Sequence, residues 1–170
     1  MKLKKIASIL VLMTFIATTA NAAVMGEFNT KFNENNTPRV TNLKLASEAI
    51  NSVILQPNEV FSYNAHVGPT TQARGFAKAK IIVDGQEKEG YGGGVCQISS
   101  TLYNAAKNAG LEIIERHPHS KEVAYVGKGK DAATSYGGVD LKFKNTLNHP
   151  IKIDSYISGN TVYVQIVRAY

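Results

Sequence analysis

Cys96 is the only cysteine of the 170-residue chain and lies within "GYGGGVCQISSTLYNAAKNAG", residues 90–110. Gly92, Gly93 and Gly94 precede it, and without side chains they let the backbone bend sharply and let a ligand approach closely. A helical pattern follows the cysteine. The N–H groups at a helix start stabilise a thiolate, and they can hold the oxyanion that forms when a thiolate attacks a carbonyl. The segment therefore favours a cysteine nucleophile at a helix N-terminus.

A thiol nucleophile needs a base, and the segment "ERHPHSKEV", residues 115–123, offers two candidates. His117 and His119 flank a proline directly after a predicted strand, and either can reach a neighbouring helix start. Asp131 and Asp140 are candidates to orient the imidazole. An H-x-H pair can also bind metal, but no further ligands cluster at suitable spacing, so we expect no metal.

Other interpretations of these residues stay open at this point. A lone thiol in an exported protein is a buried core residue, an intermolecular bridge or a reactive nucleophile. The run Ser99-Ser100-Thr101 lacks a G-x-S-x-G frame and is expected to cap and pack the helix. No G-K-[ST] follows the glycines, so a nucleotide cofactor is not expected.

The N-terminus predicts export. Three lysines precede an apolar run over residues 6–16 and an Ala-Asn-Ala motif at 20–22, which is typical of a cleavable signal peptide over residues 1–22. We expect the protein in a periplasmic or cell-wall compartment, with no transmembrane segment in the mature chain. Removing three lysines and no acid lowers the formal charge from +6 to +3. No cluster of basic and aromatic residues favours nucleic acid.

The chain predicts an α+β class: a single compact domain with two main helices packed on short, mostly antiparallel strands. Residues 23–40 are predicted to be an extended lead-in to a domain over 41–170. One helix is expected from Asn42, before Pro57, and the second from Cys96 to Gly110. Residues 59–76 are expected to be loop-rich. Strands are predicted at 79–83, 86–91, 111–116, 139–145, 151–157 and 161–168, with hairpin turns at 84–85 and 158–160.

Five segments together resemble the VanW domain family: "FSYN", "VGPTTQARGF", "GGGVCQISSTLYNAA", "ERHPHS" and "DAATSYGGVDLKFKN". The resemblance runs from about residue 42 to about residue 166. The family takes its name from glycopeptide-resistance gene clusters, and some members are L,D-transpeptidases that use a cysteine to form 3-3 cross-links in peptidoglycan. The resemblance matches that cysteine to Cys96. It also carries over, as motif positions, Gly92, Gly93, Gly94, Gln97, His117, His119 and Asp131.

The residues and the resemblance together predict a secreted cysteine acyltransferase acting on peptidoglycan stem peptides without a cofactor. Cys96 would attack the donor peptide, His119 or His117 would act as the base, and Asp131 would orient the imidazole. Backbone N–H groups near Cys96 and Gln97 would hold the oxyanion. One alternative is a cysteine peptidase or amidase that passes the acyl group to water. Another is a non-catalytic peptidoglycan-binding or glycopeptide-resistance accessory module with a structural Cys96.

Overall fold

The computed structural model describes residues 23–170, so the predicted signal peptide over 1–22 lies outside the described residues. Two long helices, α1 (Thr37–Ile50) and α3 (Val95–Asn108), accompany the short helix α2 (Tyr63–Val67) and three antiparallel sheets. This confirms the α+β class with two main helices. None of the helices between residues 23 and 170 combines the length and the apolar character needed to cross a membrane.

Residues 23–170 form small sheets from the strands β1 (Val24–Lys31), β2 (Ile54–Leu55), β3 (Val60–Ser62), β4 (Lys78–Val83), β5 (Gln86–Tyr91), β6 (Glu112–Glu115), β7 (Lys142–Lys144), β8 (Ile151–Ser158) and β9 (Thr161–Arg168). The largest has the order β1-β9-β8-β2, and the next has the order β3-β7-β6. Strands β4 and β5 form a separate hairpin. Strands β8 and β9 of the largest sheet form a second hairpin, and the other strand pairs join strands that are distant in the chain.

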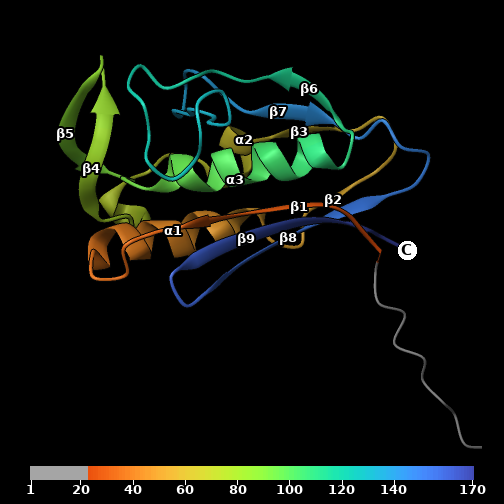
Figure 1. Ribbon diagram of the computed structural model, residues 1–170, viewed down its shortest axis with the longest axis horizontal. Coiled ribbons are helices and arrows are strands. Elements are labelled where there is room, and N and C mark those ends of the chain that lie inside the picture. The colour runs from red at the N-terminus through yellow and green to blue at the C-terminus, as the bar shows by residue number, and fades with distance from the viewer. Residues whose placement is uncertain (1–22) are drawn as a thin grey trace, which may run out of the picture.

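The two long helices lie between the two larger sheets (Figure 1). Helix α3 packs against β1 and β9 on one side and against β6 on the other, and α1 packs against β8 and α3. Helix α3 therefore buries side chains against both larger sheets, and α1 buries its own against β8 and α3. The β4–β5 hairpin stands at one end of this stack, beside the end of α3 at which Cys96 lies (Figure 1).

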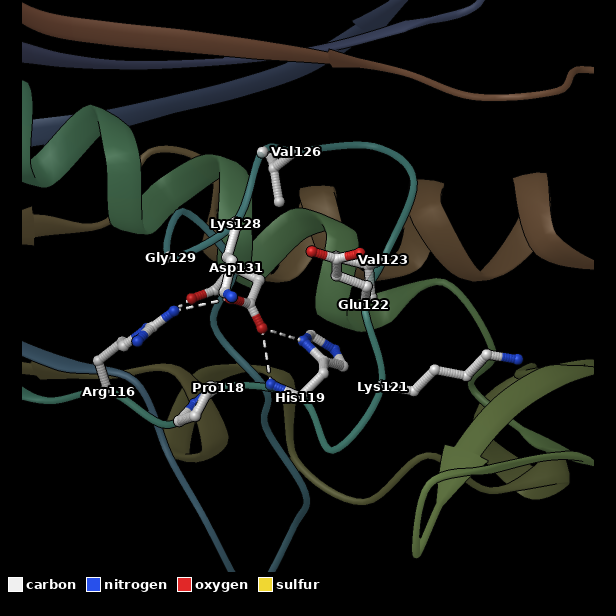
Figure 2. Close-up of a pocket in the computed structure, with 11 residues that line it drawn as sticks. Arg116, Pro118, His119, Lys121, Glu122, Val123, Val126, Lys128, Gly129 and Asp131 are labelled. Atoms are coloured by element: carbon white, nitrogen blue, oxygen red, sulfur yellow. Dashed lines mark hydrogen bonds and ion pairs between the residues drawn. The ribbon is translucent and has the colours of Figure 1, made fainter.

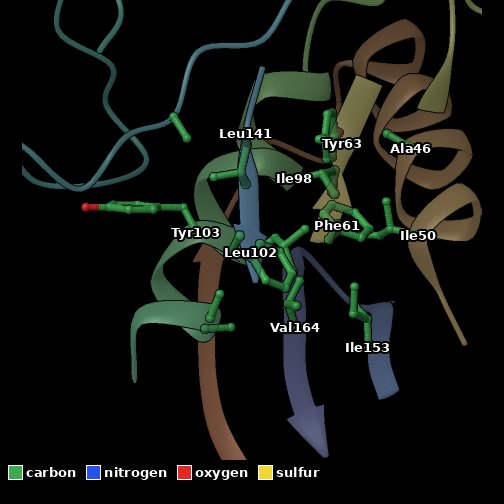
Figure 3. Packing of buried hydrophobic residues seen from close by; sticks show 14 of the residues in the cluster. Ala46, Ile50, Phe61, Tyr63, Ile98, Leu102, Tyr103, Leu141, Ile153 and Val164 are labelled. Atoms are coloured by element: carbon green, nitrogen blue, oxygen red, sulfur yellow. The ribbon is translucent and has the colours of Figure 1, made fainter. Parts of the chain in front are cut away.

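One continuous core joins the layers (Figure 3). The rings of Phe61 and Phe143, from neighbouring strands of the three-stranded sheet, stack with their centroids 4.8 Å apart. Ile98 and Leu102 of α3 and Val164 of β9 are fully buried in the same cluster. Because this core surrounds α3, the helix that carries the cysteine is held on several sides.

The predicted lead-in over residues 23–40 differs from the structure, which folds most of it into regular elements. β1 pairs along β9 as an edge strand of the largest sheet. The predicted helix start at Asn42 is wrong, because α1 begins at Thr37. The side chain of Asn36 accepts the Arg39 N–H at 3.3 Å, and Pro38 occupies the first turn, where a missing N–H costs nothing.

The strands that follow local turn signals are confirmed. Asp84 and Gly85 join β4 to β5 with φ of 52° and 75°, the paired positive φ values that a two-residue hairpin of type I′ requires. The β8–β9 hairpin has the predicted position. The 59–76 segment is more ordered than expected, since it forms β3 and α2, and β7 is shorter than the predicted strand.

Candidate active site

The glycine turn leads β5 into α3 and sets the position of the thiol. Gly92 and Gly94 have φ of 85° and 117°, values that other residues rarely adopt. Gly94 is the N-cap of α3, and no side chain caps the helix there. Cys96, the second helical residue, is half-buried. The phenol of Tyr63 donates to the carbonyl of Val95 at 2.8 Å and fixes this first turn.

Cys96, His119 and Asp131 meet at one place although they are far apart in the sequence. The thiol donates to the carbonyl of Thr134 at 3.4 Å, and it lies near enough to the His119 imidazole for each group to shift the pKa of the other. Nδ1 of His119 lies 2.7 Å from Oδ2 of Asp131. Because an ionised carboxylate only accepts, Nδ1 carries the proton, and Nε2 is the nitrogen left for the thiol.

Asp131 is held by a network of its own (Figure 2). Its Oδ1 accepts from the guanidinium of Arg116 at 2.7 Å, and its Oδ2 also accepts the backbone N–H of His119 at 2.6 Å. Burial raises the pKa of Asp131, but the bonds with His119 and the nearby Arg116 charge outweigh it and keep that pKa below its ordinary value. The carboxylate therefore stays ionised and orients His119 in a fixed direction.

Polar side chains of α3 bring Asp131 to this position. Ser99 donates to the carbonyl of Ala132 at 2.6 Å, and Ser100 accepts the Ala132 N–H at 2.9 Å. Asn104 donates to the carbonyl of Lys130 at 2.6 Å. These bonds lay the segment that contains Asp131 along the helix. The serines thus do more than the capping and packing expected from the sequence.

The site favours charge separation between the thiol and the imidazole. Burial raises the pKa of Cys96, but hydrogen bonds with His119 and Thr134 outweigh it, so that pKa lies below its ordinary value. Burial lowers the pKa of His119, but bonds with Cys96 and Asp131 outweigh it in the opposite direction, so that pKa is raised. Opposite shifts in the two partners favour a thiolate–imidazolium pair, the reactive form of a cysteine nucleophile.

His117 and Asp140 lie apart from the thiol. The His117 side chain is 43% exposed and contacts Glu115 at 3.1 Å, whereas that of His119 is 7% exposed. Asp140 accepts from the Ser62 hydroxyl and the Asn64 N–H at the start of α2. The structure therefore brings His119 and Asp131, and not His117 or Asp140, to Cys96.

Gln97 is an anchor between α3 and its neighbours. Its buried amide donates to Thr30 at 3.0 Å and to the carbonyl of Lys31 at 2.9 Å, and its N–H donates to the carbonyl of Gly94 at 2.9 Å. The predicted oxyanion role of Gln97 therefore competes with bonds that it already makes. The N–H of Cys96 has no hydrogen-bond partner among residues 23–170.

The thiol opens into a groove of about 810 Å³. The β4–β5 hairpin, the three glycines at 92–94 and the loop that carries His119 and Tyr125 form its walls, and Arg39 of α1 also lines it. A smaller pocket of about 260 Å³ borders His119 and Asp131 (Figure 2). Arg39, Thr134 and Arg116 also belong to the site but were not predicted. Arg116 and Thr134 lie within the family motifs, yet nothing in the local pattern of any of the three points to the cysteine.

Replacing Ser100 with alanine is expected to lower the free energy of unfolding by about 1–2 kcal/mol, because the buried N–H of Ala132 loses its acceptor. The Asp131 segment should also loosen, which lowers the reactivity of Cys96. Urea denaturation and the rate of alkylation by iodoacetamide measure the two effects. Ser100→Thr keeps the hydroxyl and is the matched control. An unchanged alkylation rate in the alanine variant would contradict this role.

The fold and the groove define a class of domain: an α+β domain whose central helix carries, in its first turn, a cysteine beside a buried histidine–aspartate pair. The chain belongs to the VanW family. The family model described as "VanW like protein" matches residues 38–167, which is most of the chain and includes every residue of the site. The family predicted from the sequence motifs is thereby confirmed.

Two curated proteins are similar to the chain. The uncharacterized protein YoaR of Bacillus subtilis is 43% identical over 142 residues, which cover 84% of this chain and 47% of that protein. The vancomycin B-type resistance protein VanW of Enterococcus faecalis is 32% identical over 116 residues, which cover 63% of this chain and 41% of that protein. The chain thus spans less than half the length of these relatives. No solved structure matches it.

Proposed function

We propose that this VanW domain is a secreted cysteine acyltransferase that acts on peptidoglycan stem peptides in the manner of an L,D-transpeptidase. The observation that carries the proposal is the juxtaposition of Cys96 with the hydrogen-bonded pair His119–Asp131 at the edge of an open groove. Nucleophile, base and orienting carboxylate occupy the relative positions that acyl transfer requires. The vancomycin-resistance name of one relative and the predicted signal peptide support a role at the cell wall.

In the first half-reaction, the Cys96 thiolate attacks the carbonyl carbon between the third residue of a donor tetrapeptide and its terminal D-Ala. The N–H of Cys96 stabilises the oxyanion. The C–N bond then breaks, the imidazolium of His119 gives its proton to the departing nitrogen, and free D-Ala leaves. The acyl group remains on Sγ as a thioester.

In the second half-reaction, the side-chain amine of an acceptor stem peptide attacks the thioester carbonyl. Neutral His119 takes a proton from that amine, the C–S bond breaks, and a new amide joins two third residues. The thiolate is restored and the imidazolium again faces it. Asp131 stabilises this imidazolium in both steps without exchanging a proton. No step needs a metal or an organic cofactor.

The test is intact-protein mass spectrometry of the protein and its Cys96→Ala variant after incubation with disaccharide-tetrapeptide, with the small products analysed in parallel. The expected result is a thioester adduct on the protein that has Cys96 and none on the Cys96→Ala variant, together with dimers formed with loss of D-Ala. An adduct with shortened monomers and no dimer indicates a peptidase or amidase instead. Neither adduct nor turnover in a protein that still binds peptidoglycan indicates a binding module and refutes the proposal.

A further inference from the structure

Arg39 is a cation placed beside the thiol from a different element. A Cβ on Gly94 would lie 3.1 Å from Cγ of Arg39, so the stem of the arginine lies against the glycine turn. Its guanidinium donates to Oε1 of Gln97 at 2.9 Å, and its Cζ lies 5.9 Å from the ring centroid of Tyr125. Arg39 therefore contacts the residues on both sides of Cys96 in the sequence.

Two of the other charged side chains of the groove have ion-pair partners, whereas Asp84, at the β4–β5 turn, forms no ion pair within residues 23–170. Lys80 pairs with Glu87 at 3.2 Å, and His119 pairs with Asp131 at 2.7 Å. Within residues 23–170, no aspartate or glutamate forms an ion pair with Arg39. The half-buried guanidinium thus lacks a carboxylate partner, and the site itself offers it only the nearby ionisable groups of Tyr125 and Cys96. An anionic ligand in the groove would supply a directly paired counter-ion.

The guanidinium suits a carboxylate in particular. It has five N–H donors in a planar fork, and the bond to Gln97 uses one of them, so a pair of N–H groups is left for a bidentate contact. Burial lowers the pKa of Arg39, but an arginine stays protonated in any case. The peptide substrate has a carboxylate close to the reacting bond, because only the nitrogen and the Cα of the terminal D-Ala separate its carboxylate from the scissile carbonyl.

We propose that Arg39 determines substrate specificity by binding the free terminal carboxylate of the residue that leaves when Cys96 attacks. This inference rests on the proposed function. It restricts the reaction to the last amide of a peptide, since only there does a free carboxylate follow the scissile bond. An internal amide presents an uncharged peptide group at that place and leaves the guanidinium unpaired.

A first experiment tests the anion site without any peptide. Iodoacetate and iodoacetamide alkylate the same thiolate but differ in charge, so the ratio of their rates reports the cation near Cys96. Arg39→Gln is expected to lower that ratio about tenfold, and Arg39→Lys should preserve part of it. Lys44→Gln, which removes a positive charge from the exposed face of the same helix, should leave the ratio unchanged. A ratio that survives Arg39→Gln overturns the proposal.

A second experiment compares donor peptides that end in a free carboxylate or in a carboxamide. The protein is expected to prefer the carboxylate by about 100-fold in kcat/KM, and Arg39→Gln should abolish that preference while the carboxamide peptide is processed equally by both proteins. Equal losses on both peptides, or a preference that follows a carboxylate on the third residue, overturn the proposal. If Arg39→Gln lowers the ratio of iodoacetate to iodoacetamide alkylation rates but neither peptide is turned over, the transpeptidase activity is refuted and the anion site is supported.

Discussion

Replacing His119 with alanine is expected to lower kcat/KM for the donor peptide by about 10³-fold, within the range that general acid–base catalysis contributes. The same change should raise the pKa of Cys96, because the hydrogen bond from His119 is a main cause that lowers it. Alkylation by iodoacetamide near neutral pH should therefore slow, while at alkaline pH, where every thiol ionises, the variant and the original protein should converge.

The sign of the pH dependence follows from the two shifts. Below the lowered pKa of Cys96 the thiolate is lost, and above the raised pKa of His119 the imidazolium that protonates the leaving group is lost. Lowering the first pKa and raising the second both favour the form with thiolate and imidazolium together. Because the variant should have a higher pKa at Cys96, it should lose alkylation on the acid side. His117→Ala is the matched control, since that side chain contacts Glu115. If replacing His117, and not replacing His119, moves the pH midpoint of Cys96 alkylation, the assignment of His119 as the base is contradicted.

Replacing Gly93 with alanine is expected to lower the free energy of unfolding by about 3 kcal/mol. The added Cβ would lie 2.5 Å from the carbonyl oxygen of Lys80 and 2.7 Å from the carbonyl carbon of Ala79, both backbone atoms of β4. The turn cannot retreat freely, because Asn42 of α1 donates to the carbonyl of Gly93 at 2.9 Å. Either the hairpin or the start of α3 must move.

Urea denaturation measures this loss, and the alkylation rate of Cys96 shows whether the start of α3 has moved. Gly127→Ala is the matched control, since no atom lies within 4 Å of its added Cβ and its φ is not in the left-handed range. Its effect should stay within about 0.5 kcal/mol. A stable Gly93→Ala protein would mean that the close approach of β4 to the glycine turn is not needed.

Several elements were predictable because their signals are local. The β4–β5 turn requires Asp84 and Gly85, which tolerate positive φ, and α3 follows an apolar pattern between Gly94 and Gly110. Cys96 could be singled out as a candidate because it is the only cysteine of the sequence and follows three glycines. The family motifs likewise lie along short continuous stretches. Such features depend on neighbouring residues, so the sequence by itself was enough to locate them.

Only the tertiary structure decided what the remaining residues contact. β1 has weak strand character of its own and becomes a strand by pairing with β9. His117 and His119 are alike in the sequence. Asp131, which the polar side chains of α3 position, bonds to His119 and not to His117. Arg39 bonds to Gln97, the residue next to the thiol, from a helix more than fifty residues earlier in the chain. Contacts of this kind form when separate elements share one core, and no local periodicity encodes them.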